Sequence, residues 1–70
     1  MEDVGLLIAK ERVKNNLSRV KLAEKVGCSA RSIEYWESGK RKISLENAEK
    51  ILKVLNIKII IGEGNIIYEQ

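Results

Sequence analysis

The chain has 70 residues, of which 44% are hydrophobic and 33% charged, and its formal net charge is +3. A chain of this length forms one domain with a small core, and the composition is that of a globular protein rather than a disordered one. Because the sequence has no His and only one cysteine, Cys28, we expect no intramolecular disulfide, no structural zinc site and no cofactor.

The positive charge is concentrated in the middle of the chain. Residues 10–42 contain ten Lys or Arg and four Glu, a local charge of +6, whereas residues 1–9 carry −2 and residues 43–70 carry −1. A basic middle favours a polyanion as the partner. The sequence has no charged leader followed by an apolar run and no stretch long enough to cross a membrane. We therefore expect a cytoplasmic protein with no signal peptide and no membrane partner.

Two helices are predicted in the first part of the chain. The first covers residues 4–14, is preceded by Glu2 and Asp3, and has an apolar face formed by Val4, Leu7, Ile8 and Val13. Asn15 and Asn16 end it, and Leu17 follows as a core residue. The second begins after Ser18, covers residues 19–26 and ends at Gly27, with apolar contacts from Val20, Leu22, Ala23 and Val26.

Two more helices and a pair of strands follow. The third helix covers about residues 29–36, with Ser29 as its cap and Ile33 and Trp36 on its buried side. The fourth begins after Ser44, and its apolar face consists of Leu45, Ala48, Ile51, Leu52 and Leu55. Residues 57–61 and 66–68 are rich in β-branched residues and flank a turn at residues 62–65. The predicted fold is mainly α, with four helices in residues 1–56 and a C-terminal β-hairpin in residues 57–70.

The segment from Leu17 to Ile57 resembles the helix-turn-helix domain of the Cro and XRE-type phage repressor family. The matching positions are Leu22-Ala23, the turn at Gly27, Ser29, Ile33 and the closing run Glu37-Ser38-Gly39-Lys40. Ala23 is small where the third helix crosses the second, and Gly27 accepts a positive φ. The resemblance implies a lambda-repressor-like domain that binds double-stranded DNA in a sequence-specific manner.

The resemblance also implies roles for individual residues. The helix at residues 29–36 would lie in the major groove and read bases through Ala30, Arg31 and Tyr35. Arg31 is the strongest candidate, because a guanidinium can bind O6 and N7 of guanine together. Phosphate contacts are expected from Arg19, Ser29, Ser32, Lys40, Arg41 and Lys42. Many family members have Gln where this chain has Arg19, which leaves open how this position supports the reading helix.

Four further residues of the matching segment and its surroundings are expected to have structural roles. Arg12 and Glu37 occupy positions at which related repressors form a buried or half-buried ion pair between the first and third helices. Cys28 is expected to be a small buried thiol rather than a redox switch, and Trp36 to belong to the core rather than to a base-stacking surface.

The C-terminal strands suggest a homodimer. Their isoleucines are too many for an exposed edge, and we expect them to pair with a second copy; they are Ile57, Ile59, Ile61, Ile66 and Ile67. The alternative is that the hairpin folds back on the first and fourth helices. A dimer would present two reading helices to an inverted-repeat operator.

The sequence thus predicts a small transcriptional regulator, a repressor in the simplest reading. The alternative is an antitoxin-like or adaptor protein whose main role is to bind a protein partner. The chain has no His, no phosphate-binding glycine motif and no group of residues suited to acid, base or nucleophilic catalysis, so we do not expect an enzyme.

Overall fold

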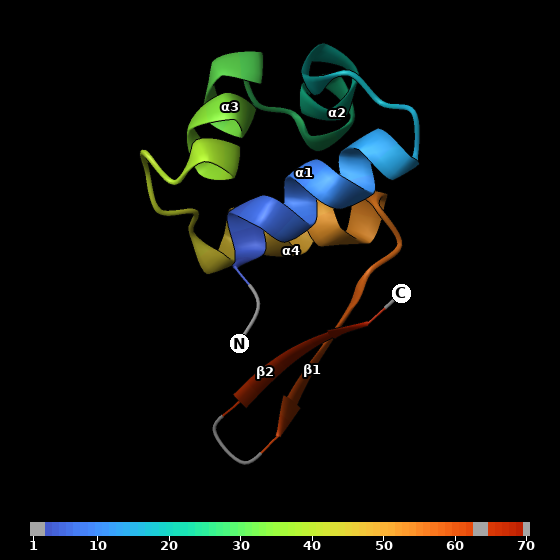
Figure 1. Ribbon diagram of the computed structural model, residues 1–70, viewed down its shortest axis with the longest axis vertical. Helices are drawn as coiled ribbons and strands as arrows, with labels where there is room; N and C mark the ends of the chain where they lie inside the picture. Colours follow the sequence, from blue (N-terminus) through green and yellow to red (C-terminus); the bar gives the residue numbers. More distant parts are fainter. Residues whose placement is uncertain (1–2, 63–64, 70) are drawn as a thin grey trace.

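The computed structural model has a body of four helices followed by two strands (Figure 1). It describes the backbone of residues 3–62 and 65–69 and the side chains of residues 3–57. The elements are α1 (Val4–Lys14), α2 (Arg19–Val26), α3 (Ala30–Ser38), α4 (Leu45–Val54), β1 (Lys58–Gly62) and β2 (Asn65–Glu69). The mainly α fold with four helices agrees with the prediction, and α3 continues two residues beyond the predicted end.

Polar side chains define where each helix begins. The three predicted serine caps have extended backbones and accept a hydrogen bond from the N–H group three residues on; they are Ser18, Ser29 and Ser44. Asp3 does the same for α1 and accepts hydrogen bonds from Gly5 N and Leu6 N at 2.8 and 3.2 Å. Glu2 lies outside the described residues.

The turns after α2 and α3 depend on glycine. Gly27 ends α2 at φ 87° and Gly39 ends α3 at φ 79°, both in the left-handed region that a Cβ disfavours. Gly27 therefore has the positive φ that the sequence predicted, and the turn it makes sets the direction in which α3 leaves α2.

One aliphatic core lies between the helices. Its buried members are Leu7, Ile8, Leu22, Ala23, Ile33, Ile51, Leu52, Leu55 and Ile57. Val13, Val20 and Leu45 were predicted to contribute apolar contacts, and the structure shows this to be wrong, because each is more than half exposed. Val13 and Val20 lie on the outer sides of their helices, and Leu45 lies in the first turn of α4.

Gly5 marks the closest approach between α1 and α3. A Cβ built on Gly5 would overlap the backbone carbonyl of Trp36 and would also crowd the carbonyl of Glu37 at 3.2 Å. Since both obstacles are backbone atoms, they cannot move aside as a flexible side chain could. The absence of a side chain at Gly5 therefore lets α1 pack against the last turn of α3.

The two strands pair in antiparallel fashion, with Lys58 opposite Glu69 and Gly62 opposite Asn65. They extend from the end of α4, away from α2 and α3 (Figure 1). Ile57 was predicted to lie in a dimer interface, but it is only 6% exposed and belongs to the helical core. The side chains of the other predicted dimer residues lie outside the described residues, as do residues 63 and 64; these are Ile59, Ile61, Ile66 and Ile67.

Within the part of the chain that the structure describes, no helix is long and apolar enough to span a bilayer. The longest, α1, has 11 residues, whereas a spanning helix needs about 20.

The substitution Gly5→Ala tests the contact between α1 and α3. Alanine has the higher helix propensity by about 1 kcal/mol, yet forcing a methyl group against a backbone carbonyl typically costs about 1–3 kcal/mol. We expect a net loss of stability, measured as the free energy of unfolding in urea. Lys10→Ala, at an exposed position of the same helix, should change it by less than about 0.5 kcal/mol. Equal or greater stability of Gly5→Ala would show that the helices can separate without cost.

Candidate nucleic-acid interface

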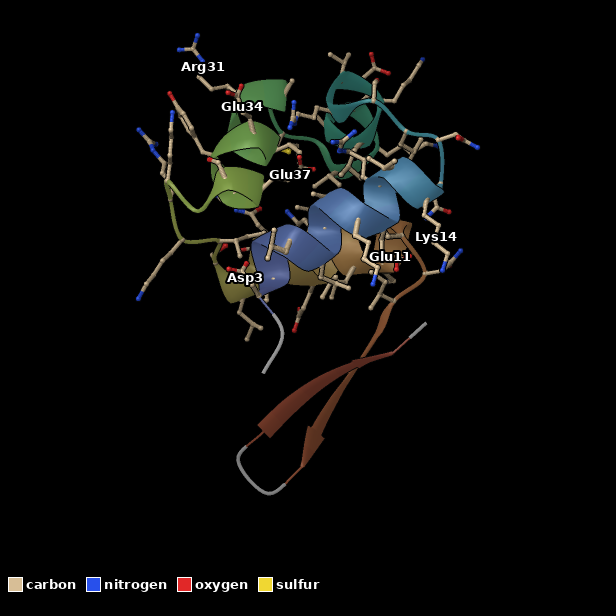
Figure 2. The ribbon with its side chains drawn as sticks, in the orientation of Figure 1. Asp3, Glu11, Lys14, Arg31, Glu34 and Glu37 are labelled. Atoms are coloured by element: carbon tan, nitrogen blue, oxygen red, sulfur yellow. The ribbon has the colours of Figure 1, made fainter. Side chains whose placement is uncertain are left out.

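The helix α3 is anchored on one side and open on the other. Ile33 is fully buried and Trp36 is partly buried against the core, so these two residues hold the helix in place. Arg31 is exposed, and Figure 2 shows its side chain extending away from the body of the molecule. An exposed guanidinium near the beginning of a fixed helix is suited to a ligand outside the domain.

A buried carboxylate joins α3 to the two preceding helices. Glu37 accepts hydrogen bonds from Arg12 at 2.7 and 3.2 Å and from Arg19 Nε at 2.9 Å. The Glu37 side chain is 4% exposed and that of Arg12 is 12% exposed. Arg12 also donates to the carbonyl of Leu17, at the start of the segment that leads to α2. The structure thus brings together the two residues that the sequence paired and adds a third.

Arg19 was predicted only as a phosphate contact. Its Nε is used for Glu37, while its side chain remains 49% exposed. The guanidinium therefore has one side directed to a buried carboxylate and an accessible remainder. An uncharged side chain at this position could not make this ion pair, so Arg19 ties the start of α2 to the last turn of α3 through Glu37. The sequence did not reveal this contact, because it depends on how α2 and α3 cross.

The other two predicted base-reading residues differ in their surroundings. Ala30 is partly buried and packs against the core, so it offers less surface to a groove than was predicted. Tyr35 is also partly buried, and the Arg41 guanidinium lies 5.0 Å from the centre of its ring. That distance is typical of a cation–π contact. Tyr35 and Arg41 therefore lie against each other, and their base and phosphate contacts stay predictions.

The remaining predicted phosphate contacts lie at the two ends of α3. Ser29 Oγ accepts from Ser32 N at 3.1 Å and lies 3.0 Å from Ser32 Oγ, so both hydroxyls are at the beginning of the helix. Lys40, Arg41 and Lys42 are exposed in the turn after it. Together they give α3 hydroxyl groups at one end and a cluster of positive charge at the other.

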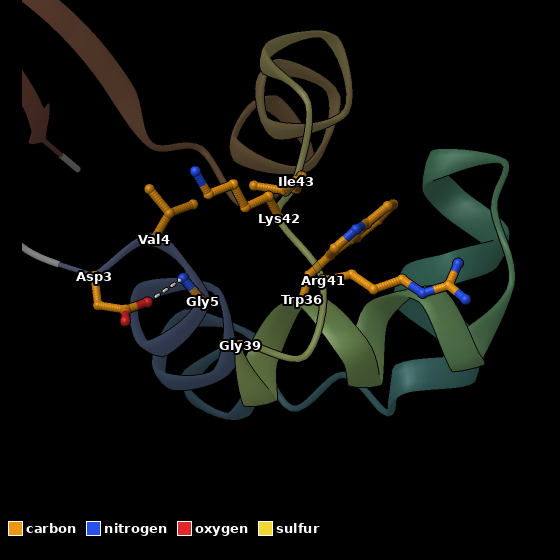
Figure 3. A pocket seen from close by; sticks show the side chains of 8 residues that line it. All are labelled: Asp3, Val4, Gly5, Trp36, Gly39, Arg41, Lys42 and Ile43. Atoms are coloured by element: carbon orange, nitrogen blue, oxygen red, sulfur yellow. Dashed lines mark hydrogen bonds between the residues drawn. The ribbon is translucent and has the colours of Figure 1, made fainter.

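The turn after α3 also passes over the beginning of α1. A shallow pocket there has a volume of about 280 Å³ and is lined by Asp3, Val4, Gly5, Trp36, Gly39, Arg41, Lys42 and Ile43 (Figure 3). Small-molecule sites usually measure ~300–1,000 Å³ and enclose most of their ligand. The Arg41 side chain extends out of this pocket along α3 (Figure 3). The pocket is thus a shallow gap between the turn after α3 and the beginning of α1 rather than a ligand site.

Cys28 lies in the turn between α2 and α3. It was predicted to be buried, but it is only partly so. Desolvation raises the pKa of its thiol above the ordinary value, against a smaller opposing effect of the Lys50 charge. A raised pKa keeps the thiol protonated at neutral pH, which agrees with a packing role.

Comparison with known proteins identifies this arrangement. Residues 8–61, more than half of the chain, match the helix-turn-helix family of Cro and XRE-type regulators. The chain belongs to this family. No curated protein matches the chain. The family consists of DNA-binding regulators rather than enzymes, and its partner is double-stranded DNA. Within it, the α2–turn–α3 unit is the helix-turn-helix and α3 is the reading helix.

Sequence reasoning missed one exposed residue of the reading helix. Glu34 lies on the outer side of α3, near Arg31 (Figure 2). It has no ion-pair partner among the residues that the structure describes. The signal that could have found it is the helical spacing of residues 30, 31 and 34, which places Glu34 on the same side of α3 as Ala30 and Arg31.

The buried ion pair gives a stability prediction. Arg12→Met keeps much of the side-chain volume but leaves Glu37 with only the half-exposed Arg19, and we expect a loss of about 3 kcal/mol, near the lower end for a broken buried pair. Lys21→Met removes an exposed pair with Glu24 at 3.6 Å and should cost at most about 1 kcal/mol. Urea unfolding measures both. Similar losses in the two variants would contradict a special role for the buried pair.

Proposed function

We propose that this helix-turn-helix protein is a transcriptional repressor that binds an inverted-repeat operator as a homodimer. The observation that carries the proposal is the exposed Arg31 on a reading helix that is fixed from behind by Ile33 and the Glu37 ion pairs. A rigid base-contacting group discriminates between bases because it cannot adapt to a wrong one.

The charges around α3 support a division between residues that contact bases and residues that bind phosphates. Lys40, Arg41 and Lys42 are exposed in the turn after the helix, and half of the Arg19 side chain is accessible at the start of α2. Contacts to phosphates increase affinity for every sequence, whereas contacts to base edges increase it for one. In this proposal the turn and Arg19 bind the backbone, and Arg31 binds a guanine.

The proposed dimer rests on the position of the strands. β1 and β2 and the reading helix lie at opposite ends of the molecule's longest direction (Figure 1), which measures 35 Å. Two reading helices in successive major grooves need a spacing of about 34 Å, so each must lie about 17 Å from the two-fold axis. In the proposed dimer, pairing through the strands would have to set that distance. The isoleucine-rich sequence of residues 59–67 would supply the apolar surface for pairing.

Arg31→Ala tests the base-reading role. We expect it to relax the preference at one base pair in each half-site, with a loss of about 1–3 kcal/mol of discrimination, measured by selecting bound sequences from random DNA. Lys40→Ala is the matched control, because it removes one charge that we assign to a phosphate. It should weaken binding to all sequences alike and reduce the slope of log K against log salt by about 1. A wild-type protein without sequence preference would refute the regulator proposal.

The dimer is tested by light scattering after size exclusion. We expect about twice the 7.9 kDa chain mass at high micromolar concentration, and the monomer mass for the double variant Ile59→Lys, Ile61→Lys, which places charges in the apolar strand. The double variant should bind a full operator no more tightly than a half-site. Val13→Lys, at an exposed position outside the strands, should remain dimeric. A monomeric wild-type protein excludes this interface.

A further inference from the structure

The unpartnered carboxylate on α3 requires an explanation. Glu34 is exposed on the outer side of a helix that faces DNA in the function proposed above, and the inference that follows rests on that function. A carboxylate near phosphates weakens binding unless it meets a hydrogen-bond donor. Arg31, three positions earlier, would be the obvious partner within the helix. The structure has no ion pair between them in the region it describes, so both groups are available to a ligand.

The position of Glu34 on the helix directs it to the same groove as Arg31. With 3.6 residues per turn, successive side chains are about 100° apart, so residue 34 lies between residues 30 and 31 around the axis. Side chains on a helix lean toward its N-terminus. Glu34 therefore leans over the turn that contains Ala30. Because Ala30 is short and partly packed against the core, it leaves room there for a longer side chain from the next turn.

We propose that Glu34 is a second base-reading residue, which accepts a hydrogen bond from an exocyclic amino group in the major groove. Both cytosine N4 and adenine N6 offer such a group. Adenine carries the acceptor N7 beside its amino group, which repels a carboxylate, whereas cytosine does not. Cytosine is therefore the favoured base. Arg31 with guanine and Glu34 with cytosine would give each half-site two G·C-dependent positions close together.

The experiment compares selected binding sites for the wild type, E34Q and E49Q. Glu49 is exposed on α4, so E49Q makes the same change of charge outside the reading helix. We expect the wild type to require cytosine at a position close to the Arg31 contact, and E49Q to give the same site. E34Q should lose that cytosine or replace it by adenine, because glutamine binds adenine N6 and N7. Far-UV circular dichroism and thermal unfolding verify that both variants fold.

Affinity measurements make the test quantitative. Replacing the selected cytosine by thymine removes the amino group, and we expect at least about a fivefold loss of affinity for the wild type and less than twofold for E34Q. If the wild type prefers adenine at this position, Glu34 still accepts a hydrogen bond from an amino group, and the donor is adenine N6 rather than cytosine N4. A site that is unchanged in E34Q overturns the role of Glu34 but leaves the regulator proposal intact. If the wild type shows no sequence preference, both the role of Glu34 and the regulator proposal are refuted.

Discussion

The structure depends on one buried carboxylate. Glu37 lies in the last turn of α3, and Arg12 from α1 and Arg19 from the start of α2 both bind it. A buried charge without partners is costly, so the three helices must keep the relative positions that bring both guanidinium groups to it. A 70-residue chain has few buried side chains to fix the orientation of a helix. Directional hydrogen bonds to Glu37 fix the orientation of α3, which the small aliphatic core alone does not.

Packing around Glu37 extends this constraint to the backbone. Gly5 lets α1 approach the carbonyl groups of Trp36 and Glu37, the same turn of α3 that carries the carboxylate. Gly27 and Gly39, with positive φ at the two turns, set where α3 begins and ends. The reading helix is thus fixed at its C-terminal turn by ion pairs and close packing, while its N-terminal turn remains accessible. That arrangement matches the need to present base-contacting residues near the beginning of the helix.

Local sequence patterns predicted the elements well, because their causes are local. Serine caps and the glycine after α2 act within a few residues, and they located the starts of three helices and the end of α2. The errors concern tertiary packing. Val13 and Val20 are apolar, but they lie on the exposed sides of their helices. Ile57 has strand character in sequence yet packs into the helical core. The contact of Arg19 with Glu37 could not be predicted, since it depends on how α2 and α3 cross.

In the proposed function, affinity and discrimination come from different residues. On the exposed side of α3, the charges of Arg31 and Glu34 cancel, and Glu37 is neutralised by Arg12 and Arg19. The helix therefore adds little net attraction to DNA, and in the proposed function non-specific binding comes from residues 40–42 and the accessible part of Arg19. A reading helix without net charge gains free energy only where its donors and acceptors meet complementary base edges. Such a helix favours specificity over affinity, and in the proposed dimer the second copy supplies the additional binding energy.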